Sequence, residues 1–461
     1  MTASSTATAE YGVAPLRLNV GRDFCAFIAG FKYEDLPEAV VHESRRGVLD
    51  WIGCALAGSR HPKIPKLLAG IEALGSAERA RVIAHDLKLG FLEAAIVNGQ
   101  IGHILDYDDT HMDGVVLHTS SPVLAALLSV AESGAFSGRD LIAAYAAGFE
   151  AGVRVGKASP GHHDGGWHLT GTLGSIAAGV AVGRMLGLDP MQMTYALGIA
   201  TTQAAGMQQN RGTMCKSFHA GKAASNGVLA GFLAREGFDS SDEIIEGKRG
   251  FSRTFSSGSR PEALLDGLGT DWQILRNGYK PYACGIVVHP LIDGMTALRR
   301  RGIDPAQIDR VEIVVNPAAV RITGVEEPQT GLQSKFSIYH SAAVAFLDGN
   351  AGIAQYSDER ALAPEVVELR RKVRVSVDDR FRKDEAHVAV VDADQVRHET
   401  HVDHAAGTVD NPISDAAMEE KFLANAELAV GKARSREIAE AVWSLETMSD
   451  VRDLVQLMQL K

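Results

Sequence analysis

The order of helical and strand-like segments along this chain restricts its fold more than any other feature. From residue 16 to about 257, apolar side chains recur with helical spacing, as they do over 36–57 and 220–235. β-branched runs of strand length then appear at 311–315, 373–377 and 387–391, with helical pieces between them. Helical spacing returns after Asn411-Pro412 in two predicted helices, over 415–430 and 435–445.

This order predicts two domains, which a chain of 461 residues also favours because it is too long for one ordinary core. We expect a mainly α fold with an α+β lid. Residues 16–265 and 409–461 would form one all-helical domain, discontinuous in sequence, and residues 266–408 a smaller α+β lid domain. Residues 1–15, rich in Ala, Ser and Thr, are expected to form a disordered tail.

The charge balance excludes several classes of partner. Lys and Arg number 46 against 57 Asp and Glu, which gives a net charge of −11 and argues against nucleic acid or an anionic membrane as a partner. No run reaches the roughly 20 apolar residues of a membrane span. The four cysteines lie far apart, as is usual for a reducing compartment, so a cytoplasmic protein is expected. Because the net charge is negative, an anionic substrate would need a local basic site.

One acidic cluster runs from His103 to Asp113 and admits three interpretations. The three interpretations are a solvated helix end, a metal site, and part of a metal-free acid/base site. The metal-dependent alternative would be built on Asp106, Asp108, Asp109 and His111. A non-catalytic helical scaffold is a further alternative.

Two histidines precede predicted helix starts, where free backbone N–H groups and the helix dipole favour an anion. His118 lies before Ser120-Ser121-Pro122, and His168 lies before the helix expected over 171–186. Downstream, Arg211, Lys216 and Lys222 form a basic stretch with no acidic residue from 206 to 235. A buried lysine there would have a depressed pKa and could bind a carboxylate or carry a proton.

Several blocks together resemble the MmgE/PrpD family, in order and at comparable spacing from about residue 20 to 430. They are His103–Thr110, His118–Pro122, Gly166–Thr170, Met214–Gly221, Lys280–Cys284 through His289, and Phe336–Tyr339. The resemblance implies the same two-domain architecture, a homodimer and no cofactor. It also implies a small polycarboxylate substrate, with 2-methylcitrate dehydration, cis-aconitate decarboxylation and iminodisuccinate epimerisation as family activities.

By motif, the resemblance implies catalytic residues on both domains and no metal ligand. Those in the helical domain are Asp106, Thr110, His118, His168 and Lys216, and those in the lid are His289 and Tyr339. The cleft would then lie between the domains. The dehydratase branch of the family carries Asn in the block where Asp108 stands and His-Pro-Ser at 118–120. The choice among the three reactions stays open.

We assign the roles as a hypothesis. Lys216, His118 and the helix start at Ser120 would anchor carboxylates, with Arg211 and Lys222 as further candidates. His168 or His289 would act as base, and Tyr339 or the other histidine would deliver a proton. Asp106 would orient a histidine or Thr110.

Overall fold

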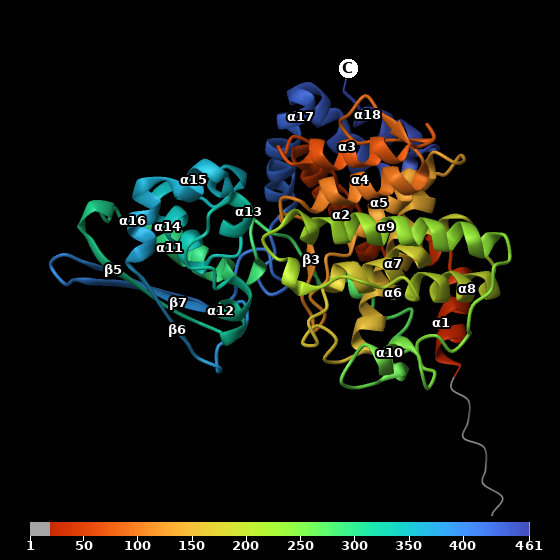
Figure 1. The fold of residues 1–461 in the computed structure, drawn as a ribbon, viewed down its shortest axis with the longest axis horizontal. Helices are drawn as coiled ribbons and strands as arrows, with labels where there is room; N and C mark the ends of the chain where they lie inside the picture. The colour runs from red at the N-terminus through yellow and green to blue at the C-terminus, as the bar shows by residue number, and fades with distance from the viewer. Residues whose placement is uncertain (1–18, 461) are drawn as a thin grey trace, which may run out of the picture.

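Helices from both ends of the chain pack into one body, and the central part of the chain forms a separate lobe beside it (Figure 1). The computed structural model describes residues 19–460, so the predicted tail over 1–15 lies outside the described residues. The mainly α fold with an α+β lid is confirmed. Within residues 19–460, no helix combines the length and apolarity that crossing a bilayer requires.

The helical body surrounds a core of small and branched apolar side chains. Its N-terminal helices are α1 (Val20–Gly30), α2 (Glu38–Ser59), α3 (Ile64–Leu74), α4 (Phe91–His103), α5 (Ser120–Ala131), α6 (Gly138–Lys157), α7 (Leu169–Met185), α8 (Pro190–Thr201), α9 (Met214–Arg235) and α10 (Phe251–Thr254). The C-terminal helices are α17 (Asp415–Trp443), which packs against α2, and α18 (Arg452–Leu457). Two short antiparallel pairs join β1 (Ala80–Arg81) to β2 (Lys88–Leu89) and β3 (Thr110–His111) to β4 (Asn277–Gly278).

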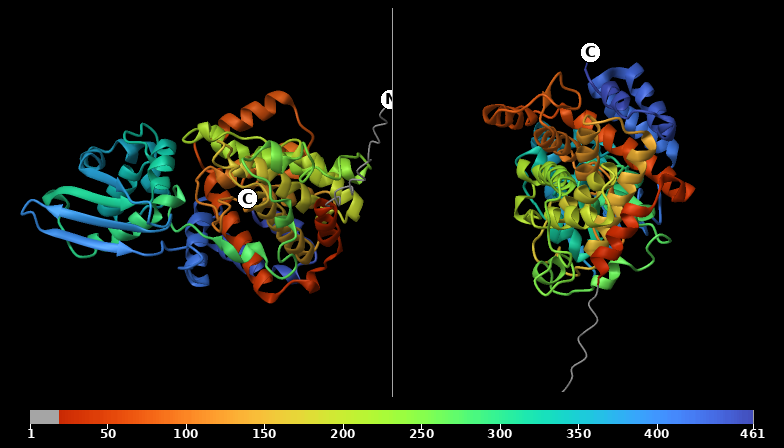
Figure 2. Two further views of the ribbon diagram at one scale, coloured as in Figure 1. Left: turned by 90° about the horizontal axis from the view of Figure 1, so that it is seen from below. Right: turned by 90° about the vertical axis from the view of Figure 1, so that its right-hand side faces the viewer.

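The lid is a four-stranded sheet with helices packed on it (Figure 2). The strand order is β6 (Val373–Val377), β5 (Ile308–Val315), β7 (Ala386–Asp392) and β8 (Arg397–Val402), with β5 and β6 parallel and the other pairs antiparallel. The helices are α11 (His289–Arg299), α12 (Pro317–Thr323), α13 (Gly331–Ser334), α14 (Ile338–Asp348), α15 (Asp358–Leu362) and α16 (Pro364–Arg371). Of these, α11 contacts β7 and β8, and α14 contacts β6.

The predicted strands at 311–315, 373–377 and 387–391 coincide with β5, β6 and β7. The fourth strand was missed because Arg397–Val402 consists mainly of charged and polar residues at the sheet edge and has no buried side chain. The two helices predicted after residue 411 form one element, α17, which is interrupted at Gly431 by a non-helical conformation with φ 75° and ψ 167°. That glycine lies between the two predicted helices.

Glycines allow α4 and α9 to approach closely, and this contact positions the site. A Cβ at Gly221 would overlap the carbonyl oxygen of Ile96, and a Cβ at Gly99 would lie 2.6 Å from the Cα of Gly221. Backbone atoms on both helices therefore leave no room for a side chain. This approach brings the first turns of α9, which carry Lys216 and His219, toward the end of α4 at His103.

We expect Gly221→Ala to destabilise the protein by about 1–3 kcal/mol, because a methyl group there must push two helix backbones apart. Gly70→Ala is the matched control. Gly70 lies in α3, is exposed and has no atom within 4 Å of an added Cβ, so alanine should stabilise by roughly 0.5–1 kcal/mol. Chemical denaturation measures both. Equal effects of the two substitutions would contradict the packing argument.

Candidate active site

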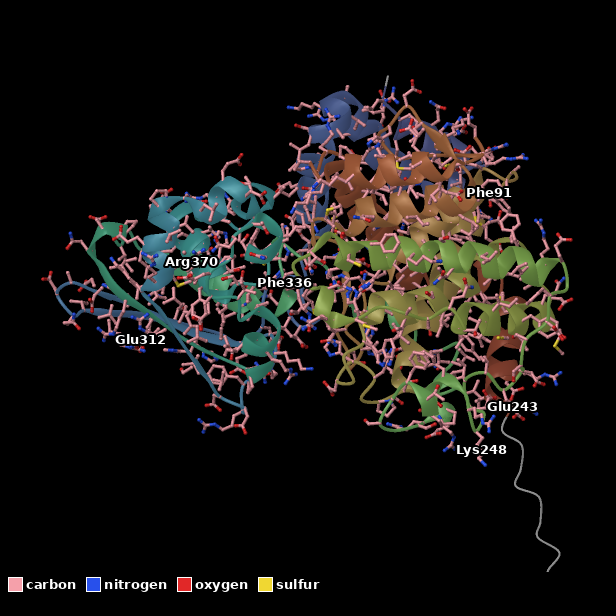
Figure 3. All side chains as sticks on the ribbon, viewed as in Figure 1. Phe91, Glu243, Lys248, Glu312, Phe336 and Arg370 are labelled. Atoms are coloured by element: carbon pink, nitrogen blue, oxygen red, sulfur yellow. The ribbon has the colours of Figure 1, made fainter. Side chains whose placement is uncertain are left out.

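A cavity of about 210 Å³ lies where the helical body meets the lid. Among the body residues that line it are Asp106, His118, His168, Arg211 and Lys216, and among the lid residues are Lys280, Arg321, Phe336 and Lys383. Phe336 marks this boundary between the two lobes in Figure 3. The cavity is therefore built from segments that are distant in sequence.

Asp106 is the centre of the buried charge in this cavity. Lys216 Nζ lies 3.1 Å from Asp106 Oδ2, and Lys280 Nζ lies 2.6 Å from Oδ1 and 3.0 Å from the Asp106 carbonyl oxygen. Burial alone would raise the pKa of Asp106, but the two ammonium groups hold it well below its usual range. Burial lowers the pKa of Lys216, and Asp106 opposes that change. Two buried cations thus share one carboxylate.

His118 is held with one ring nitrogen toward the backbone and the other toward Asp106. Its Nδ1 lies 2.9 Å from the Asp109 carbonyl oxygen and 3.1 Å from Thr110 Oγ1. Because a carbonyl oxygen only accepts, Nδ1 carries the proton in the neutral ring. Nε2 then presents a lone pair 3.8 Å from Asp106 Oδ1. Burial, reinforced by Lys280, lowers the pKa of His118 well below its ordinary value.

His168 forms a second imidazole site at the entrance to α7. Its Nδ1 lies 2.9 Å from Nδ1 of His219, so one ring donates a hydrogen bond to the other. Its backbone N–H donates to the Gly206 carbonyl oxygen. Burial and the nearby Lys216 lower its pKa well below the ordinary value. These lowered pKa values favour the neutral form of both His118 and His168 in the free protein at neutral pH.

A second buried pair, His103 and Asp108, lies beside His118 and does not line the cavity. His103 Nδ1 lies 2.9 Å from both carboxylate oxygens of Asp108, and Asp108 accepts a hydrogen bond of 2.7 Å from Ser121. The His103 ring packs on His118 with 4.6 Å between centroids. This pair keeps a carboxylate 3.6 Å from His118 Nδ1 without exposing it to the cavity.

Five of the ten residues predicted from sequence line the cavity: Asp106, His118, His168, Lys216 and Arg211. Thr110 touches His118 from the side away from the cavity. The other four lie elsewhere. Ser120 bonds Asp109 and Tyr145 in the body core, Lys222 donates to Asn226 along α9, His289 is fully buried against Tyr282, and Tyr339 is a half-buried residue of α14.

Three cations of the lid were not predicted as site residues. Lys280 stands in the Lys280–Cys284 block of the family resemblance. It is the single charged residue within a mostly apolar stretch, Tyr279 to His289, and this isolated charge is the signal that could have indicated it. Arg321 on α12 and Lys383 in the β6–β7 loop have no such signal. Only the folded lid brings them to Arg211.

Arg211, Arg321 and Lys383 form a cationic cluster at the cavity, called here the outer cations. Among residues 19–460, none of the three lies within 4.0 Å of a carboxylate oxygen. Burial is the largest cause that lowers the pKa of His163 to about 4, and the charges of the three outer cations lower it further. With Lys216 and Lys280 the lining carries five Lys and Arg side chains against two carboxylates, Asp106 and Asp164. In a chain of net charge −11, this local excess of positive charge is suited to a polyanion.

Two groups of side chains in the described part of the chain bring three metal-ligating atoms together. They are His103, Asp108 and His118 beside the cavity, and Asp384, His404 and Asp410 on the lid. In the first group, each of the three side chains has a protein hydrogen-bond partner, and Lys280 and Lys216 lower the pKa of His118, so their charge opposes a cation. Within residues 19–460, no three of Asp106, Asp108, Asp109 and His111 converge in this way.

Comparison with known proteins agrees with this architecture. Residues 22–264 match the MmgE/PrpD N-terminal domain, and residues 282–447 match the MmgE/PrpD C-terminal domain. A cis-aconitate decarboxylase of Aspergillus terreus is 31% identical, over 95% of this chain and 96% of its own. The cis-aconitate decarboxylases of Mus musculus and Homo sapiens are 26% and 25% identical over 96% of this chain, and over 93% and 95% of their own. The chain therefore belongs to the MmgE/PrpD family.

Proposed function

We propose that this protein is a lyase that removes CO₂ from a small tricarboxylate, with cis-aconitate as the substrate. The observation that carries the proposal is the lining of the cavity, which combines five cationic side chains, the imidazoles of His118 and His168 with their lowered pKa values, and the buried carboxylate of Asp106. Full-length similarity to proteins named cis-aconitate decarboxylase supports the choice of substrate.

The distribution of cations suits a trianion. Lys216 and Lys280 share the charge of Asp106, so together they carry one net positive charge at the inner end of the cavity. The outer cations supply three more from the side of the lid and the Arg211 loop. A substrate with three carboxylates would therefore neutralise both ends at once, through charge-assisted hydrogen bonds from Lys and Arg side chains.

The reaction needs one proton and releases one CO₂. The bond between the methylene carbon and its carboxylate breaks, and its electron pair forms the new terminal double bond. The electrons of the original double bond take a proton at the CH carbon, so that cis-aconitate and a proton give itaconate and CO₂. The enzyme must therefore place an acid beside that carbon while it holds the carboxylates that remain.

His118 is our proposed proton donor. Its Nδ1–H is fixed on the Asp109 carbonyl, so the proton that it gains and transfers is on Nε2, on the side of Asp106. A bound trianion would reverse the effect of the neighbouring lysines and raise the pKa of His118, which protonates the ring when substrate arrives. Asp106 would stabilise that imidazolium. His289 and Tyr339, assigned acid/base roles from sequence, do not line the cavity.

We also propose that no metal or cofactor takes part, because the proton and the positive charge that the reaction requires are both supplied by side chains. Full activity in excess chelator would support this. Loss of activity that is restored by Mg²⁺ or Zn²⁺ would favour the metal-dependent alternative.

Proton NMR of the purified protein in D₂O tests the substrate. We expect vinyl signals of itaconate from cis-aconitate, and none with Lys216→Ala, which removes an ammonium from Asp106. New vinyl signals from 2-methylcitrate would instead indicate a dehydratase. Deuterium at a methine of iminodisuccinate with a new diastereomer would indicate an epimerase. If all three compounds remain unchanged, the proposed function is wrong.

The outer cations should determine the affinity for the third carboxylate. We expect Arg321→Gln and Lys383→Gln each to raise the KM for cis-aconitate about tenfold or more, corresponding to the loss of ~1.4 kcal/mol or more from one charged contact, with a smaller effect on kcat. Arg380→Gln is the control, because Arg380 lies in the same β6–β7 loop, pairs with Asp378 and does not line the cavity. Equal KM values in all three variants would contradict this assignment.

His118→Gln should lower kcat by about 10²–10⁴-fold while substrate still binds, since a general acid contributes that much.

The pKa of His118 also predicts the direction in which binding affinity changes with pH. Because His118 is neutral in the free protein and protonated beside a trianion, binding of the saturated analogue propane-1,2,3-tricarboxylate should take up protons at neutral pH. Affinity should therefore fall as pH rises. Calorimetry in buffers of different ionisation enthalpy measures the uptake, which should shrink in His118→Gln. Zero uptake by the wild-type protein would refute the protonation step.

A further inference from the structure

A third buried lysine joins the two lobes next to the cavity. Lys335, in the turn after α13 of the lid, is 3% exposed. Its Nζ lies 2.7 Å from the carbonyl oxygen of Leu105 and 2.6 Å from that of Ala283. Leu105 belongs to the helical body and Ala283 to the lid, so one ammonium group binds a carbonyl from each lobe.

The Leu105 carbonyl is part of the peptide plane that enters Asp106. Asp106 has φ 51°, in the left-handed region that non-glycine residues seldom adopt without support. The peptide plane that leaves Asp106 is bound as well, because Lys280 donates to the Asp106 carbonyl oxygen at 3.0 Å. Lysines therefore hold the peptide planes on both sides of the Asp106 Cα.

We propose that Lys335 is a positioning residue, which holds Asp106 in its left-handed conformation so that the Asp106 carboxylate faces Lys216 and Lys280. It acts through Asp106 and does not line the main cavity. The inference rests on the proposed function only in that turnover is measured as decarboxylation.

The charged and titratable groups around Lys335 predict how this role depends on pH. They are Asp106, Lys280, Cys284, Lys216, the Tyr356 ring 5.0 Å from Nζ, and His61. Burial, reinforced by the two other lysines, lowers the pKa of Lys335 to about 8. Below that pH the ammonium group donates to both carbonyls. Above it the neutral amine is a weaker donor, so the conformation of Asp106 and the turnover rate should be lost as pH rises.

The test compares Lys335→Met, Lys335→Arg and a control, Lys372→Met, from pH of about 6 to 10. Lys372 is also a lid lysine that donates to a backbone carbonyl, that of Ile308, but it does not line the cavity. We expect Lys335→Met to lower kcat about a hundredfold with little change in KM, because a displaced Asp106 disturbs the chemistry while the outer cations still bind substrate. Lys335→Arg should retain activity and move the alkaline fall in kcat up by about one pH unit or more.

Each remaining outcome decides the question. Wild-type kcat and an unchanged alkaline fall in a folded Lys335→Met would overturn the proposal, and an unchanged fall in Lys335→Arg would assign it to another group such as Lys216. If Lys335→Met does not fold, the dependence of kcat on pH in Lys335→Arg alone decides the question. If the wild-type protein does not decarboxylate cis-aconitate, the proposed function fails. Lys335 is then tested by the structure of Lys335→Met, in which Asp106 should leave its left-handed conformation and its carboxylate should turn away from Lys216 and Lys280. An unchanged Asp106 in that variant would overturn the proposal.

Discussion

The ion cluster around Asp106 is the constraint on which the rest of the site depends. A single buried carboxylate has ammonium groups on both oxygens, and a third lysine binds the preceding carbonyl. Burial of such a group without partners would favour its neutral form, so the lysines are what keep Asp106 ionised. The surplus of positive charge that remains around it is suited to a polyanion.

The fold places this cluster at the junction of two lobes. Asp106 and Lys216 come from the helical body, whereas Lys280 and Lys335 come from the lid. The approach of α9 to α4, which glycines on both helices permit, brings Lys216 within 3.1 Å of Asp106. Changes in helix packing far from solvent therefore act directly on the electrostatics of the cavity.

The sequence predicted the fold class and five of the residues that line the cavity, for identifiable reasons. Helical spacing and β-branched runs report local structure, and histidines at helix starts are visible in the pattern at His118 and His168. The outer cations Arg321 and Lys383 could not be found this way, because what distinguishes them from other surface cations is their position at the cavity, which only the folded lid creates. The left-handed conformation of Asp106 also left no trace in the sequence, since an aspartate there looks like any other.

The central claim is that both lobes bind one polycarboxylate around Asp106 and His118. A crystal structure with propane-1,2,3-tricarboxylate tests it most directly. The account predicts one carboxylate on Lys216 and Lys280, at least one on the outer cations, and the carbon chain beside His118 Nε2. A ligand bound elsewhere, or held by residues of one lobe alone, would contradict it.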